Sequence, residues 1–108
     1  MRARPLAELL RLPVRIGGIH LGRPVEALVG RTGRLLGFEV ARRDGTSCFL
    51  PFAAAVVLDD EIAVRSPLVL DERIAPYYRE RAIGLAQLGL VDPWIYEDGT
   101  VREALSAA

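Results

Sequence analysis

Apolar and polar residues alternate through the middle of the chain, a pattern typical of half-buried β-strands. Residues 35–42 predict one strand, and residues 46–52 predict a second strand that returns beside it. The Asp44–Gly45 pair between the two runs is a strong signal for a tight hairpin turn. The alternation places Leu36, Phe38 and Val40 on one face of the first strand, and Cys48, Leu50 and Phe52 on one face of the second.

Shorter strand signals lie on both sides of this hairpin. They predict brief strands at residues 25–29, 56–58 and 61–65. Gly30 and Gly33 indicate a hairpin turn after the first of these, and the acidic pair Asp59–Asp60 indicates a turn between the other two. A bend or helical turn is expected at residues 53–55. Several short strands at close spacing, without long helices between them, predict a small barrel or sandwich.

The beginning of the chain carries a helical pattern instead. Leu6, Leu9 and Leu10 have helical spacing, and Pro13 ends the short helix that this spacing predicts over residues 4–12. We interpret this helix as a preface to the barrel and not as part of it.

The end of the chain is also predicted to be partly helical. A helix is expected from residue 71 to about residue 88, followed by a break at residues 91–94. Thr100 and Glu103 have capping-box spacing, which predicts a last short helix over residues 101–107. The expected organisation is a helical segment at residues 1–18, a barrel at residues 19–68, and a helical or irregular extension at residues 69–108.

Length and composition fit one globular domain. The chain has 108 residues, of which 51% are apolar and 26% are charged, and these values exclude a globally disordered chain. The single cysteine, Cys48, excludes an intrachain disulfide and a cysteine zinc cluster. No apolar run approaches the ~20 residues that span a bilayer, and the first residues lack a secretory-signal pattern. We therefore expect no membrane span and a cytoplasmic location.

Charge is distributed unevenly along the chain. All fourteen basic residues are arginine, and there is no lysine. Residues 1–43 carry a net charge of +6, and residues 44–108 carry a net charge of −6. One interpretation is a first half that faces nucleic acid or a membrane. The other is a compact fold that interleaves both halves, so that the charges pair with one another or face solvent.

Three short motifs resemble the PRC-barrel family. Residues 22–25 (Gly-Arg-Pro-Val) and 33–40 (Gly-Arg-Leu-Leu-Gly-Phe-Glu-Val) are similar to the family's glycine-containing hairpin. Residues 50–52 (Leu-Pro-Phe) precede an Ala-Val run, as in the family, and residues 60–64 (Asp-Glu-Ile-Ala-Val) resemble its closing strand. The match covers residues 21–68, a little under half of the chain.

This resemblance implies a small mainly β barrel of about six short strands, here with a short N-terminal helix and a partly helical C-terminal extension. Members of the family include the cytoplasmic domain of the photosynthetic reaction-centre H subunit and the C-terminal domain of a ribosome-maturation factor. The resemblance also implies that the protein is not an enzyme and acts as an adaptor on a larger assembly.

The residues with reactive or ligating side chains do not form a recognisable catalytic set. His20 is the only histidine and has no partner residues at metal-ligand spacing. Cys48 shares its predicted face with apolar residues, which favours a core position over a catalytic thiol. The acidic run at residues 59–61 lacks the spaced ligands of a calcium loop. We therefore expect no catalytic residues, no cofactor and no metal.

Two groups of residues are candidates for binding a partner. The first group combines aromatic residues and arginines, the types that most often anchor interfaces: Tyr77, Tyr78, Arg79, Arg81, Trp94 and Tyr96. The alternative is that these aromatic rings complete the core. The second group flanks two hairpin turns and is a candidate patch for RNA phosphates or an acidic protein: Arg31, Arg34, Arg42 and Arg43. The alternative is a solvated edge that prevents sheet-to-sheet pairing.

The sequence thus favours a non-enzymatic interaction module that binds a protein partner or a second copy of itself, with a homodimer as the expected oligomer. An RNA- or ribosome-associated maturation factor that uses its arginine-rich face is the alternative. Such a factor would bind more weakly as salt is added.

Overall fold

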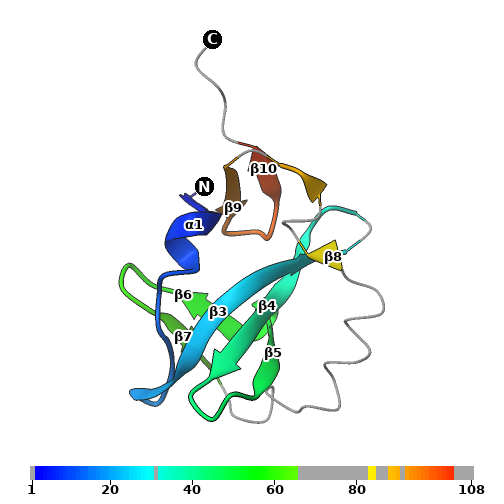
Figure 1. The fold of residues 1–108 in the computed structure, drawn as a ribbon. Coiled ribbons are helices and arrows are strands. Elements are labelled where there is room, and N and C mark those ends of the chain that lie inside the picture. The colour runs from blue at the N-terminus through cyan, green and yellow to red at the C-terminus, as the bar shows by residue number, and fades with distance from the viewer. Residues whose placement is uncertain (1, 31, 66–82, 85–87, 91, 104–108) are drawn as a thin grey trace.

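Two β-sheets make up most of the chain that the computed structural model describes, namely residues 2–30, 32–65, 83–84, 88–90 and 92–103 (Figure 1). The elements are β1 (Ala3–Pro5), α1 (Leu6–Leu9), β2 (Val14–Ile16), β3 (Ile19–Val29), β4 (Leu35–Arg42), β5 (Ser47–Pro51), the 3₁₀ turn η1 (Phe52–Ala54), β6 (Ala55–Val57), β7 (Ile62–Val64), β8 (Ile83–Gly84), β9 (Pro93–Tyr96) and β10 (Val101–Glu103). The fold is therefore mainly β, as predicted, although its described part already exceeds the expected six strands.

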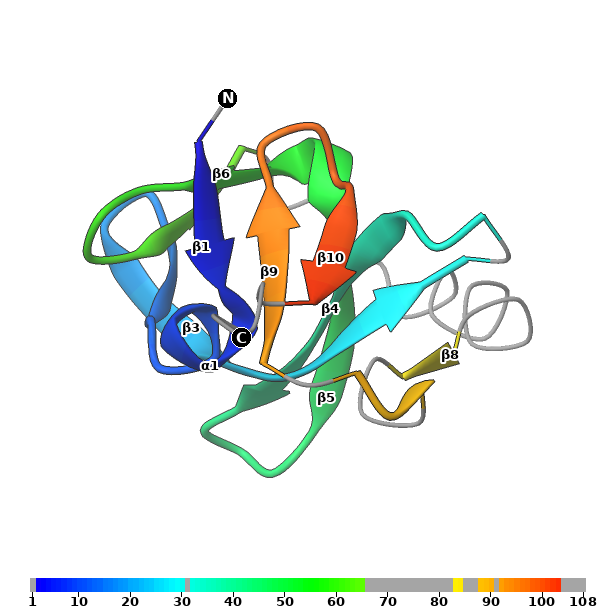
Figure 2. The ribbon, with the colours of Figure 1, turned by 90° about the horizontal axis from the view of Figure 1, so that it is seen from above.

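The larger sheet is organised around β3, which has eleven residues. Its strands follow the order β5-β4-β3-β2-β7-β6, and β8 also pairs with β3. Because β3 is long, β2 pairs with its beginning and β8 with its end, while β4 runs along the opposite edge. The sheet curls into a half-barrel (Figure 2). The half-barrel stays open because its two outermost strands, β5 and β6, are joined through η1 but are not paired with each other.

The smaller sheet has the order β1-β9-β10 and lies across one end of the curled sheet (Figures 1 and 2). Backbone hydrogen bonds connect it to the start of β4. The Leu35 N–H donates to the Gly99 carbonyl at 2.8 Å, and the Arg34 guanidinium donates to the Asp98 carbonyl at 3.0 Å. The turn between β9 and β10 is therefore fixed on the larger sheet.

The central hairpin forms where the alternating pattern predicts it. β4 covers residues 35–42 and β5 covers residues 47–51, and Gly45 in the connecting turn has a φ of +85°. The acidic pair Asp59–Asp60 also forms the predicted turn between β6 and β7. Both local predictions are confirmed. They succeed because each hairpin is specified by residues that are neighbours in the sequence.

One residue of the hairpin was assigned to the wrong face. Phe38 and Val40 are fully buried in the main core, but Leu36 packs with Leu28 and Phe49 in a second cluster. The β3–β4 register shifts between Leu28 and Val29, so that Leu36 is the extra residue of a bulge. A bulge reverses the side-chain alternation of a strand, and Leu36 therefore points away from the main core.

A second bulge explains how proline occurs inside β3. Pro24 lies opposite Val40, and the pairing register shifts between Pro24 and Glu26. Proline has no N–H to donate, and within sheets it is confined to edges and bulges. The chain before Pro24 approaches β4 very closely, because a Cβ at Gly22 would overlap the backbone of Ala41. β3 begins at Ile19, so the strand predicted at residues 25–29 was too short at its beginning.

The N-terminal segment belongs to the fold and is not a preface to it. α1 is a single turn between Pro5 and Pro13, and the residues after it form β2 inside the larger sheet. Proline restricts the residue that precedes it to extended conformations, which limits the helix on its C-terminal side. The segment also contributes four buried side chains to the main core: Leu6, Leu9, Leu12 and Val14.

Three strands lie in the described parts of residues 69–108, and Leu88 there has 3₁₀-helical geometry. Residues 83–84 form β8, residues 93–96 form β9 in place of the predicted break, and residues 101–103 form β10 in place of the last helix. The Asp98 carboxylate accepts a hydrogen bond from the Thr100 N–H at 2.9 Å, which makes a hairpin turn. The capping-box prediction was wrong for residues 101–103, which pair with β9 as a strand, and residues 104–107 of that predicted helix lie outside the described residues. Residues 71–82 and 85–87 of the predicted helix at residues 71–88 lie outside the described residues.

Candidate docking groove

A groove of about 390 Å³ lies between the smaller sheet and the outer edge of β6. Its volume is in the range of small ligand sites, ~300–1,000 Å³. We call it the β6 groove, and its lining residues are Arg2, Arg4, Leu9, Phe52, Ala53, Ala55, Val56, Val57, Arg65, Ile95, Tyr96 and Glu97. Elements from both ends of the chain and from its middle therefore meet at this place.

All three residues of β6 line the groove, and β6 is the last strand in the order of the larger sheet, so its outer edge has no neighbour among the described strands. On its inner edge β6 pairs with β7, and Val56 lies opposite Ala63. The flanking hydrogen bonds run from the Leu58 N–H to the Glu61 carbonyl (2.8 Å) and from the Arg65 N–H to the Ala54 carbonyl (3.0 Å). Hydrogen-bonded and non-hydrogen-bonded pairs alternate along an antiparallel ladder. Val56 and Ala63 are therefore the hydrogen-bonded pair between these two bonds.

The residues on either side of Val56 consequently direct their backbone groups away from β7. The Ala55 N–H is used within η1, where it donates to the Phe52 carbonyl. The Ala55 carbonyl and both backbone groups of Val57 are left on the outer edge of β6. The groove therefore exposes one donor and two acceptors along a strand that has no neighbour on this side among the described strands.

The inner wall of the groove is apolar. Leu9 and Ile95 belong to the buried core, and Phe52, Ala55 and Val57 pack against it while remaining partly exposed. Phe52 also lies beside the β9–β10 turn, since a Cβ at Gly99 would be 3.5 Å from its ring. An apolar wall beside an open strand edge can accept an apolar side chain together with its peptide backbone.

Arginines dominate the charged lining, with Arg2, Arg4 and Arg65 against Glu97. Arg65 follows β7 and is exposed, and the described part of the chain gives it no ion pair. Its backbone N–H is bonded next to η1, so Arg65 lies at the end of β6 where the strand begins. This end of the groove therefore presents a cation that no described carboxylate neutralises.

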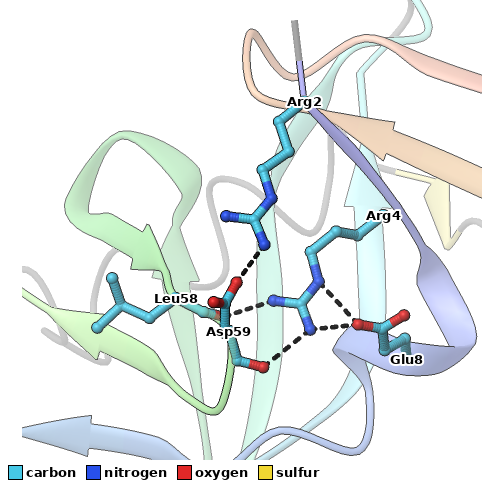
Figure 3. A network of polar contacts seen from close by, with 5 residues as sticks. All are labelled: Arg2, Arg4, Glu8, Leu58 and Asp59. Carbon is cyan, nitrogen blue, oxygen red and sulfur yellow. Dashed lines mark hydrogen bonds and ion pairs between the residues drawn. The ribbon is translucent and has the colours of Figure 1, made fainter.

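Arg4 closes the opposite end, at the turn after β6 (Figure 3). Its guanidinium donates to the Leu58 carbonyl, to the Asp59 carbonyl at 3.1 Å and to the Glu8 carboxylate, with Nε at 2.9 Å from Oε1. Only 12% of its side chain is exposed. Arg4 is thus a fixed link between the smaller sheet and the β6–β7 turn.

Arg2 and Asp59 form a second, exposed link at the same end (Figure 3). Their side chains are 59% and 79% exposed. The hydrogen bond from Arg2, together with its positive charge, holds the pKa of the Asp59 carboxyl below its ordinary value of 3.8. Exposed ion pairs contribute little to stability, and this pair can open at small energetic cost.

The aromatic candidates are divided between the groove and the rest of the surface. Tyr96 lines the groove, and its ring lies 5.8 Å from the Arg102 guanidinium carbon. Trp94 is 37% exposed, and the Ile95 side chain between these two aromatic residues is buried. The other members of this candidate group lie outside the described residues: Tyr77, Tyr78, Arg79 and Arg81.

The described arginine candidates lie at opposite ends of β4. Arg34 lies immediately before β4, whereas Arg42 is its last residue and Arg43 follows it. A strand of eight residues spans about 26 Å, so the two groups are separated by the length of β4. Arg34 is also engaged with the Asp98 carbonyl. Arg31 lies outside the described residues.

Of the residues considered for catalysis, Cys48 is fully buried in the main core, as predicted. His20 is partly buried on β3, and its Nδ1 atom has no hydrogen-bond partner in the described part of the structure. Within that part, no three histidine, cysteine or acidic side chains gather closely enough to hold a metal ion. Neither Cys48 nor His20 lines the β6 groove.

Sequence reasoning did not identify Arg2, Arg4 or Arg65 as site residues. They come from positions far apart in the chain, and they meet only because β1 pairs with β9 across the end of the half-barrel. No motif at neighbouring positions indicates such a meeting. The one available signal was the unequal charge of the two halves of the chain, which does not specify positions.

Comparison with known proteins adds no family. No family model matches the chain, and no curated protein has a sequence significantly similar to it. Among the described residues, no helix is long and apolar enough to cross a membrane.

Proposed function

We propose that this chain is a non-enzymatic interaction module of PRC-barrel type that acts as an adaptor, and that it binds a partner protein in the β6 groove. The observation that carries the proposal is the outer edge of β6, which no described strand covers and where Ala55 and Val57 present backbone groups beside an apolar wall. Edge strands with unpaired backbone groups are ready templates for pairing with another chain. The PRC-barrel type rests on the sequence resemblance over residues 21–68.

A capture experiment tests this function. The tagged protein is incubated with lysate of its native cells, with and without RNase, and the retained proteins are identified. Ala53→Trp places a large side chain at the exposed mouth of the groove, because Ala53 lines the groove and is exposed. Ala7→Trp is the matched control, since Ala7 is exposed on α1 and does not line the groove.

We expect a discrete set of proteins that survives RNase, that Ala7→Trp retains and that Ala53→Trp loses. Capture of ribosomal proteins or RNA that disappears with RNase or added salt would favour the RNA-associated alternative and contradict the adaptor function. Capture that is equal for both variants would place the binding surface elsewhere. Sedimentation of the pure protein over a concentration series shows whether the occupant is a second copy of the chain.

A further inference from the structure

We propose that the β6 groove binds its partner as an added β-strand, and that it selects an extended segment in which apolar and acidic side chains alternate. This inference rests on the proposed function and specifies the chemistry of the partner. Strand addition is a common way in which an exposed sheet edge binds a peptide: backbone hydrogen bonds supply affinity, and pockets for alternate side chains supply specificity.

The backbone groups define the register of the added strand. For a peptide that adds antiparallel to β6, Val57 offers an N–H and a carbonyl to one peptide residue, and Ala55 offers a carbonyl to the residue two positions away. The peptide residue between these two positions turns its backbone groups away from β6. Only every second amide N–H of the peptide therefore donates to the protein.

The two faces of the added strand meet different surroundings. Ala55 and Val57 pack toward the core, as do Leu9 and Ile95 on the other side of the groove. Peptide side chains on this inner face therefore meet apolar surface. Side chains on the outer face lie on the same side of the sheet as Val56 and its paired residue Ala63. Because side chains alternate along a strand, the residue two positions after Ala63 also lies on this side.

Arg65 is the residue two positions after Ala63, and it also lines the groove. Because the described part of the chain gives Arg65 no ion pair, a peptide carboxylate would be its first charged partner there. Arg2 adds a second cation at the other end of the groove, and its exposed pair with Asp59 can exchange for a peptide carboxylate. Charge complementarity therefore favours acidic side chains on the outer face.

The probe is a phage library of random nine-residue peptides, selected on the immobilised full chain. Enriched peptides are synthesised with a fluorescent label, and their dissociation constants are measured by fluorescence polarisation. Each peptide is also made with a single N-methyl amide at every position in turn. An N-methyl group removes one donor and leaves the protein unchanged, so this scan does not depend on the folding of a variant.

We expect enriched peptides in which acidic and apolar residues alternate, and N-methylation that weakens binding about tenfold at every second position, with little effect between. Arg65→Glu should weaken binding of the acidic peptides about tenfold and improve binding of versions with lysine in place of the acids. The matched control is Arg43→Glu, an exposed residue on the β4–β5 turn that does not line the groove, and it should change the affinity less than twofold.

A selection that yields no peptides, peptides without acidic enrichment, or an N-methyl scan without a period of two would overturn the inference. These failures differ from failure of the proposed function. If Ala53→Trp still abolishes capture of a protein partner from lysate, the groove binds that partner in another way and the adaptor function stands. If neither experiment involves the groove, both proposals are wrong.

Discussion

Replacing Gly22 with alanine should strongly destabilise the fold, because β3 and β4 touch at this position. A Cβ on Gly22 would overlap the Ala41 carbonyl oxygen and would lie 2.9 Å from its carbonyl carbon. Real Cβ atoms essentially never come within 3.0 Å of another heavy atom, and here the obstructing atoms are backbone. No rotamer change can relieve the overlap, so the two strands must move apart where Gly22 pairs with Arg42.

The magnitude follows from that separation. Overpacking a filled site costs ~1–3 kcal/mol, and each ladder hydrogen bond that is stretched until it breaks adds about 1 kcal/mol. We therefore expect Gly22→Ala to lower the free energy of unfolding by about 3 kcal/mol or more. For a chain of this length, this corresponds to a fall in Tm on the order of 10 °C. Urea denaturation followed by circular dichroism measures the first quantity, and a thermal melt measures the second.

Gly30→Ala is the matched control. Its Cβ would meet the Leu36 side chain at 3.4 Å, an ordinary contact, and the φ of Gly30 is not in the left-handed region. The same substitution should therefore be neutral or raise stability by roughly 0.4–1 kcal/mol through the unfolded state. A Gly22→Ala variant within 1 kcal/mol of the wild type, or one less affected than Gly30→Ala, would refute the close approach of β3 and β4.

Three further predictions concern the core and the groove. Leu9→Ala should lower the free energy of unfolding in urea by about 2–5 kcal/mol, since Leu9 is 1% exposed in the main core; a loss below 1 kcal/mol would mean that the N-terminal segment does not belong to that core. Cys48→Ser should cost about 1–3 kcal/mol by burying a hydroxyl group, and the native thiol should react with a thiol reagent only after unfolding; rapid labelling of the native protein would contradict this. Because Arg2 lowers the pKa of Asp59, the pair stabilises the fold at neutral pH and loses that effect as the pH falls below 3.8. Thermal melts of Asp59→Asn and the wild type should therefore differ slightly at neutral pH and converge in acid, and a constant difference would exclude the ion pair as its cause.

The parts of the fold that sequence reasoning predicted are those specified by neighbouring residues. The Asp44–Gly45 turn and the flanking alternation locate β4 and β5 to within a residue or two. The bulge in β4 is not specified in this way. Leu36 is its extra residue and lies on the other face of the sheet, although the alternating pattern of the sequence is unchanged. Register depends on both strands of a pair, and the sequence of one strand alone does not specify it.

The ends of the chain were predicted least well, and for a related reason. β1 and β10 have three residues each, and both are stabilised mainly by pairing with β9, which lies far from β1 in sequence. Local propensity is a weak guide where tertiary contacts decide the conformation. The Thr100 and Glu103 spacing fits a helix start, but the Asp98–Gly99 turn before it is an equally local signal for a hairpin.

The same pairing that escaped prediction also explains how an open strand edge can be tolerated. A free edge invites aggregation, and proteins commonly cover it or place charges beside it. Here the smaller sheet lies opposite the outer edge of β6, and Arg4 ties the two together at the β6–β7 turn. The smaller sheet therefore stands beside this edge, and the groove of about 390 Å³ lies between them. The N-terminal strand thus limits what can pair with β6, although β6 is an outermost strand of the larger sheet.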